Sequence, residues 1–119
     1  MMDSILNTIK LKIGYEPDYT PFDTEITDLI NTALRRANQL GVGKPNFIIT
    51  GPDETWQDFL GDNVLLFADV KTYIYIYVKL IHDPPSNSFL ITNLKDEMSE
   101  LEWRMNVNHE TPFVGDNDE

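Results

Sequence analysis

Lys71 to Met105 reads KTYIYIYVKLIHDPPSNSFLITNLKDEMSELEWRM, and this stretch decides the fold. Its first part alternates tyrosine with isoleucine, which on propensity alone favours a β-strand. The apolar run from Val64 to Ile81 covers about 18 residues, however, which is too long for an ordinary strand. A helical stripe also runs through it, formed by Phe67, Val70, Ile74, Val78 and Ile81, with Tyr77 beside it. We therefore expect a helix that is apolar on nearly every side and lies at the centre of a bundle.

The double proline in Asp83-Pro84-Pro85 ends this helix, because the residue before a proline is pushed out of the α region. Ser86, Asn87 or Ser88 then caps a last helix. The apolar stripe of that helix is formed by Leu90, Leu94, Met98, Leu101 and Met105. At 100° per residue, Trp103 and Val107 lie on the opposite face, with Trp103 about 180° from Leu94. A large aromatic ring there meets either a second layer of its own domain or a neighbouring subunit, so Trp103 and Val107 are candidate subunit contacts.

Two further helices are expected upstream. The first spans Asp3 to Ile13, and the second begins at Asp23, its N-cap, and stops at Gly41. A turn segment with two prolines, residues 15–21, joins them. The buried face of the second helix is formed by Ile26, Leu29, Ile30, Ala33, Leu34, Ala37 and Leu40. Arg35 and Arg36, in its C-terminal half, either complement the helix dipole or form a salt bridge to a neighbouring subunit.

The segment between the second helix and the central one is expected to be mostly non-helical. Phe47 to Thr50 forms either a short strand or an extended piece laid over the core. Thr55 and Asp58 have the spacing of a capping box, which opens a single helical turn. Trp56 and Phe59 in this polar loop either pin it to the core or contact a partner, so both are also candidate subunit contacts.

The chain carries a net charge of −11 and has a pI near 4.4, which argues against binding DNA or RNA through a basic patch. The acidity serves solubility, provides a surface past which DNA slides, or mimics DNA. The sequence contains no cysteine, so disulfides, cysteine zinc sites and thiol catalysis are excluded. The first residues lack the pattern of a signal peptide, and no apolar run approaches the roughly 20 residues that cross a bilayer. We therefore expect a soluble protein made in the cytoplasm, without membrane contact.

Motifs for catalysis or cofactor binding are missing from the sequence. His82 and His109 lie far apart and have no carboxylate at ligand spacing. Gly41-Val42-Gly43 is too short for a nucleotide loop and follows a helix instead of starting one. The carboxylates of Asp53-Glu54 and Asp96-Glu97 are sequence neighbours, which on a helix point in different directions and make poor acid–base pairs. We expect no enzymatic activity, no cofactor and no metal.

The ordered set of these segments resembles the head–tail connector, or adaptor, proteins of tailed phages and prophages. The resemblance covers about residues 3–107. Its most specific elements are the Gly41–Gly43 turn, Trp56 to Asp62, Lys71-Thr72-Tyr73, Asp83-Pro84-Pro85 with Ser88-Phe89, and Glu100 to Arg104. No single motif is diagnostic, and the similarity lies in their order.

This resemblance implies an all-α bundle of about four main helices that assembles into a ring, typically dodecameric, beneath the portal of the capsid. Such a ring extends the DNA channel, lets genomic DNA pass without specific binding, docks on the portal and offers a platform to the next neck or stopper protein. It is a non-catalytic part of the virion, assembled in the cytoplasm of the host bacterium. Residues 1–107 form the connector domain in this interpretation.

Residues 108–119 read NHETPFVGDNDE and are expected to form a flexible acidic tail. A short apolar anchor lies inside it, and it suits docking on a partner's surface or sheet edge, which in this family would be the portal. The candidate portal-docking residues are Thr111, Pro112, Phe113 and Val114.

Two other functions stay open at the level of sequence. One is a small acidic regulator or DNA mimic, encoded by a phage, that binds a host protein. The other is a general interaction domain outside any virion.

Overall fold

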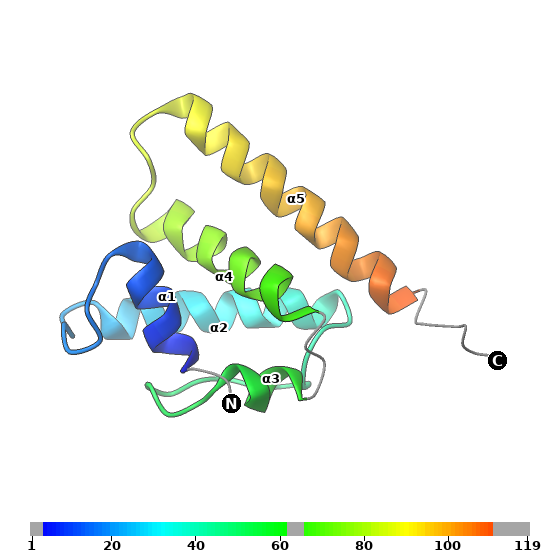
Figure 1. Ribbon diagram of the computed structural model, residues 1–119, viewed down its shortest axis with the longest axis horizontal. Helices are drawn as coiled ribbons and strands as arrows, with labels where there is room; N and C mark the ends of the chain where they lie inside the picture. Colours follow the sequence, from blue (N-terminus) through cyan, green and yellow to red (C-terminus); the bar gives the residue numbers. More distant parts are fainter. Residues whose placement is uncertain (1–3, 62–65, 111–119) are drawn as a thin grey trace.

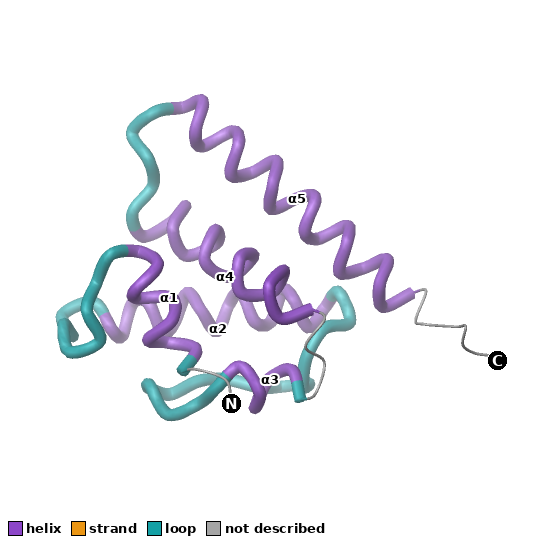
Figure 2. The backbone as a smooth tube through the Cα atoms, viewed as in Figure 1, coloured by secondary structure: helices purple, strands orange, loops and turns teal. Residues whose placement is uncertain are grey.

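The structure, a computed structural model, describes residues 4–61 and 66–110. These residues form five helices and no strand, as Figures 1 and 2 show. The helices are α1 (Ile5–Ile13), α2 (Asp23–Gln39), α3 (Trp56–Leu60), α4 (Phe67–His82) and α5 (Ser88–Glu110). The expected small all-α bundle is confirmed, with α3 as the single turn.

Helix α4 is the centre of the bundle and packs against α1, α2 and α5 (Figure 1). The β-strand that its alternation of tyrosine and isoleucine favours does not form. Its fully buried side chains are Val70, Tyr73, Ile74, Ile76 and Val78. Because these positions surround the helix on several sides, the β-branched residues find partners in three neighbouring helices. Tertiary packing thus overrides strand propensity, as the length of the run predicts.

The residues at the ends of the two long apolar stripes are predicted to lie in the core, and this prediction is wrong. Ile81 is 51% exposed and Leu90 is 48% exposed, whereas Leu101 and Met105, at the other end of α5, are 2% and 0% exposed. Figure 1 shows the reason: α5 lies close to α4 near its own C-terminus and diverges from it toward the loop 83–87. The apolar periodicity continues where the packing stops.

The predicted helix ends are mostly confirmed. Ser4 caps α1 by accepting the backbone N–H of Asn7 at 3.2 Å. The side chain of Asn87 accepts the N–H of Phe89 at 2.7 Å at the start of α5. The capping box of α3 is complete. These side chains satisfy backbone donors that the first turn of a helix leaves without partners.

Asp23 differs from the expectation, because it is the first residue of α2 and Phe22 stands at the N-cap without a side-chain hydrogen bond. The Asp23 carboxylate instead lies 2.8 Å from Nζ of Lys10, a lysine that is only 1% exposed. The same Nζ donates to the carbonyl of Pro17 at 2.9 Å. A buried ammonium needs a counter-charge and full hydrogen bonding, so this contact holds α1, the turn segment and α2 together.

The segment before α3 is extended but pairs with no strand in the described part of the chain. Its fixed point is Ile49, which is 1% exposed. The side-chain amide of Asn31 on α2 accepts the N–H of Ile49 at 2.8 Å and donates to its carbonyl at 3.0 Å. One asparagine therefore makes the two bonds that a neighbouring strand would supply, which explains why a strand-like segment needs no sheet.

Helix α5 runs through Glu110, so the domain boundary expected at residue 107 falls inside it. No proline or glycine occurs between Asn87 and Pro112 to stop the helix earlier. Residues 111–119, the rest of the expected tail, lie outside the described residues. None of the described helices has the length and apolar character needed to cross a bilayer.

Gly43→Ala is predicted to destabilise the fold, because Gly43 has φ +84° and an added Cβ would overlap the Phe59 ring. We expect a loss of about 1–3 kcal/mol in the free energy of unfolding, measured by urea denaturation followed by circular dichroism. Gly51→Ala is the matched control, since its Cβ would meet nothing within 4 Å. Equal stability of the two variants would contradict the packing described here.

Candidate interaction surface

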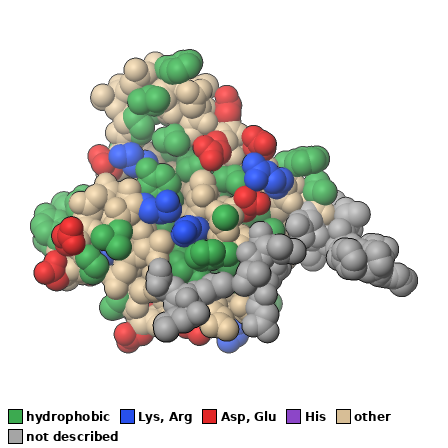
Figure 3. All heavy atoms as spheres, viewed as in Figure 1, with side chains coloured by type: hydrophobic (Ala, Val, Ile, Leu, Met, Phe, Trp, Pro, Cys, Tyr) green, Lys and Arg blue, Asp and Glu red, His purple; other side chains and the backbone are tan. Residues whose placement is uncertain are grey.

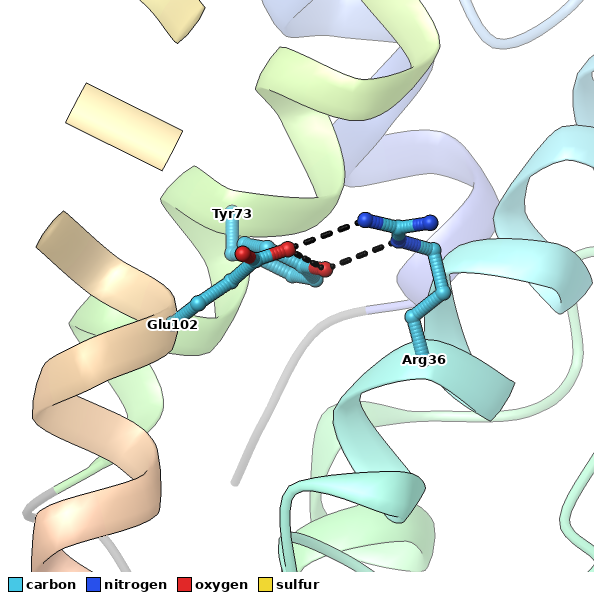
Figure 4. A network of polar contacts seen from close by, with 3 residues as sticks. All are labelled: Arg36, Tyr73 and Glu102. Atoms are coloured by element: carbon cyan, nitrogen blue, oxygen red, sulfur yellow. Dashed lines mark hydrogen bonds and ion pairs between the residues drawn. The ribbon is translucent and has the colours of Figure 1, made fainter. Parts of the chain in front are cut away.

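Three side chains from three helices meet at one point near the C-terminal end of α2 (Figure 4). The hydroxyl of Tyr73 on α4 accepts from Nε of Arg36 on α2 at 3.0 Å and donates to Oε2 of Glu102 on α5 at 2.8 Å. Nη2 of Arg36 also reaches Oε2 of Glu102 at 3.0 Å. The contacts close a triangle, which we name the three-helix clamp, and it fixes α2, α4 and α5 relative to one another.

The electrostatics of the clamp follow from its burial. Tyr73 is 0% exposed, and burial together with the hydrogen bond and negative charge of Glu102 raises its pKa to about 12. The hydrogen bonds from Arg36 to Tyr73 and Glu102 raise the pKa of the guanidinium above its usual value. The clamp therefore holds a neutral phenol between a cation and an anion.

A second polar contact fixes the rotation of α5. Arg104 donates to Asp69 on α4 at 3.1 Å and to Glu100 at 3.3 Å. In the segment Leu101–Met105, the first and last residues are apolar and buried. Between them, Glu102 belongs to the clamp and Arg104 forms an ion pair with α4. The residue between them, Trp103, has to face outward.

Trp103 is 65% exposed, and no second layer of the described chain covers it. Val107, one helical turn later, is half-buried. A tryptophan held outward by ion pairs on both of its sequence neighbours is a fixed apolar surface of the kind that protein contacts use. Of the two alternatives for Trp103, cover by a second layer of its own domain is not seen among the described residues, and contact with a neighbouring subunit stays a prediction.

A second exposed apolar surface lies where α4 and α5 diverge. We name it the hairpin tip: Ile81, Phe89 and Leu90, which are 51%, 69% and 48% exposed. In the space-filling view, apolar side chains gather at the top of the molecule, where α5 begins (Figure 3). The hairpin tip and Trp103 thus lie toward opposite ends of α5, separated by charged side chains.

The other sequence candidates fall in three places. Trp56 and Phe59 are buried within the chain itself, at 0% and 2% exposure, so neither side chain is offered to a neighbouring subunit. They pin the loop to the core, which is the packing role weighed for them, and Nε1 of Trp56 donates to Thr8 at 3.1 Å. Arg36 is used inside the subunit by the clamp. Arg35 is exposed and pairs with no carboxylate among the described residues.

The candidate portal-docking residues Thr111, Pro112, Phe113 and Val114 lie outside the described residues. Within residues 4–61 and 66–110, no three carboxylate or histidine side chains converge as a metal site requires.

Sequence reasoning missed a polar cluster at the other end of α4. Nδ1 of His82 lies 2.6 Å from Oε2 of Glu25 on α2, and its Nε2 lies 3.0 Å from the hydroxyl of Tyr15. Burial and the nearby charge of Asp83 raise the pKa of Tyr15. The partners of His82 are 57 and 67 residues away along the chain, so spacing could not reveal them. The cluster holds the turn segment 15–21 against α4.

A model of the family described as phage connector protein matches residues 5–112. No curated protein and no solved structure gives a significant match. The matched range contains every described helix and both exposed apolar surfaces.

Tyr73→Phe is predicted to lower the free energy of unfolding by about 1–2 kcal/mol, because it removes a hydroxyl that both donates and accepts in the clamp. It should also change the dependence of stability on pH. A tyrosine in an unfolded chain ionises near pH 10, whereas Tyr73 in the folded protein ionises near 12. The stability that this group contributes is present below pH 10 and is lost as the pH rises toward 12.

Urea denaturation at several pH values between 8 and roughly 11 measures both effects. The difference between wild type and Tyr73→Phe should shrink across that range. Tyr75→Phe is the matched control on the same helix, since Tyr75 makes no side-chain hydrogen bond among the described residues. A constant difference at every pH would show that Tyr73 is not the titrating group.

Proposed function

The chain belongs to the phage connector protein family, and on this premise we propose that it is a subunit of a homo-oligomeric ring in the head–tail connector of a tailed phage. The ring is dodecameric, sits under the portal and extends the DNA channel toward the neck. The family is a structural one, so the role is assembly and not catalysis. The observation that carries the proposal is the outward Trp103, an apolar surface fixed by two ion pairs within an otherwise compact bundle.

A ring in which every subunit contacts the next one head to tail needs two different faces on each subunit. The Trp103–Val107 face of α5 supplies one of them. The hairpin tip supplies the other, because it is also apolar and lies at the far end of the same helix. Arg35 stays a candidate for a contact at the edge of the interface, where one exposed charge contributes little to affinity.

The charge of the chain suits a channel through which DNA moves. With 20 acidic and 9 basic residues, the surface repels the phosphate backbone and offers few cations to hold it. Four of the nine cations are also engaged in ion pairs within the subunit, namely Lys10, Arg36, Lys79 and Arg104. DNA is therefore a passing cargo of the ring and not a ligand.

The remaining partners follow from the position of the ring. The portal binds on the head side, through Thr111, Pro112, Phe113 and Val114 as the docking segment, and a neck or stopper protein binds on the tail side. The protein is then a component of the virion that is assembled in the cytoplasm of the host bacterium.

The decisive experiment is native mass spectrometry of the purified protein, alone and mixed with its portal. We expect a closed ring of about twelve copies with the portal, and either the ring or free subunits without it, since the portal can serve as template. A compact monomer or dimer that ignores the portal and captures a host DNA-binding protein would instead support the acidic regulator.

Trp103→Ala is predicted to weaken the ring far more than the fold. Its side chain contacts solvent in the subunit, so we expect the free energy of unfolding to change by less than about 0.5 kcal/mol. Loss of a central aromatic contact should cost about 2 kcal/mol or more at each interface. The fraction of rings on portal complexes, counted by native mass spectrometry or electron microscopy, measures this effect.

Leu11→Ala is the matched control, because Leu11 is an exposed apolar residue (54%) on α1, a helix that carries neither of the two proposed faces. It should leave the ring intact. Rings of Trp103→Ala that are as stable as those of the wild type would remove Trp103 from the interface.

A further inference from the structure

A groove of about 580 Å³ lies between α2 and the segment 44–48. Its lining includes two cations and no aspartate or glutamate. In a chain with 20 acidic and 9 basic residues, this groove is a local reversal of charge. The lining residues that give the groove its character are Arg35, Gln39, Lys44, Phe47 and Ile48.

The two cations of the groove are available to a partner. Arg35 and Lys44 are exposed, and neither forms an ion pair with a carboxylate among the described residues. The same groove has an apolar part, because Ile48 is 59% exposed and Phe47 is half-buried against Phe59, at 5.4 Å between ring centroids. The groove therefore combines an apolar surface with two positive charges.

The turn segment 15–21, at the other end of α2, has the opposite charge. Glu16 and Asp18 are exposed, and neither forms an ion pair with a cation among the described residues. Two aromatic side chains belong to the same surface, since Tyr19 is 44% exposed and Phe22 is 37% exposed. Apolar and acidic side chains lie together at the left edge of the molecule in Figure 3, where Figure 1 places this segment. We name these four residues the acidic turn.

The acidic turn is held in place from within the subunit. The buried ammonium of Lys10 donates to the carbonyl of Pro17, the residue between the two acids. The ring of Tyr15 stacks on those of Tyr19 and Phe22, at 5.3 and 5.7 Å between centroids. The acids and the exposed rings are therefore presented on a fixed backbone.

The groove is fixed as well, by the side-chain amides of α2. Asn31 bonds to both the N–H and the carbonyl of Ile49. Asn38 donates to the carbonyls of Val42 and Gly43 at 3.1 and 3.2 Å. Because neither surface has to be ordered when they meet, their association costs little conformational entropy.

We propose that the acidic turn of one copy of this chain docks in the groove of a second copy. The two acids of the turn meet the two cations of the groove, and the aromatic rings of the turn pack on the apolar surface at Ile48. The surfaces match in the number and sign of their charges and in having an apolar part, which is the complementarity that selects partners and speeds their encounter.

The placement of the two surfaces makes a second copy the occupant. Helix α2, with 17 residues, is about 25 Å long. The groove lies along its C-terminal half and the acidic turn precedes it, so the two surfaces cannot meet within one subunit. Copies that each carry a net charge of −11 repel one another, and contact between them needs a place where the charge is reversed. Each copy has one surface of each kind, as a head-to-tail contact requires.

This contact deepens the proposed function and rests on it in one respect, because it names the charged part of the contact between neighbours in the ring. Along the longest axis, which is horizontal in Figure 1, the turn segment and the loop 83–87 lie toward one end. The C-terminal parts of α2 and α5 lie toward the other end. The acidic turn thus shares an end with the hairpin tip, and the groove shares an end with the Trp103–Val107 face.

Disulfide trapping in the free, full-length protein tests the proposal. The chain has no cysteine, so Thr20→Cys (the turn variant) and Gln39→Cys (the groove variant) each introduce one thiol, at exposed positions. The variants are mixed in equal amounts, one of them labelled with ¹⁵N, and oxidised, and mass spectrometry separates the three disulfide dimers. We expect the mixed dimer to exceed either dimer of identical variants by about tenfold, as electrostatic steering allows, whereas random collision gives only the statistical excess.

Reversal of charge shows whether the two surfaces recognise each other. Adding Arg35→Glu and Lys44→Glu to the groove variant should reduce the mixed dimer to its statistical share, because acids then face acids. Adding Glu16→Lys and Asp18→Lys to the turn variant as well should restore the mixed dimer, because the charges are again opposite. High salt should weaken both the original and the restored contact.

Lys95→Glu in the groove variant is the matched control, since Lys95 is exposed, does not line the groove and forms no ion pair among the described residues. It should leave the mixed dimer unchanged, and circular dichroism checks that every variant is folded. A mixed dimer at its statistical share without any charge change, or one that survives charge reversal, overturns the proposal. A ring on the portal would then still support the proposed function, with other faces, whereas a dominant mixed dimer without any ring would support this contact and contradict the ring.

Discussion

The buried hydroxyl of Tyr73 is the contact on which the arrangement of the long helices depends. It donates to Glu102 and accepts from Arg36, so one atom of α4 positions both α2 and α5. Burying a phenol between two charges is favourable only when all three groups are satisfied, and here they satisfy one another. Removing Arg36 or Glu102 would leave the buried hydroxyl of Tyr73 incompletely bonded.

The clamp also determines which face of α5 the protein presents. Glu102 and Arg104 are both used for contacts within the subunit, and the tryptophan between them is therefore directed to solvent. Because the clamp and the packing of Leu101 and Met105 act only at the C-terminal half of α5, the other half diverges from α4. The subunit therefore has two exposed apolar surfaces, one at Trp103 and one at the hairpin tip, and the head-to-tail ring that we propose requires two such different faces.

The charged side chains divide between contacts inside the subunit and the outer surface. The ion pairs inside the subunit engage cations at the ends of the helices, and the net charge of −11 remains for the outer surface. Between α2 and the segment 44–48, a groove is lined by Arg35 and Lys44 and by no aspartate or glutamate.

The sequence alone determined the helices and most of their ends, because periodicity, capping residues and prolines are local signals. Three features could be predicted in this way: the central helix at residues 67–82, the capping box at Thr55 and the outward face of Trp103. It could not show where packing stops along a stripe, so Ile81 and Leu90 were misassigned to the core. Only the tertiary structure decided the clamp, the His82 contacts, the pairing of Lys10 with Asp23 and the burial of Trp56. Each of these contacts joins residues that are distant in sequence, and its geometry arises only when the helices pack. The pattern within one helix shows which face is apolar, but it does not show which residues that face will contact.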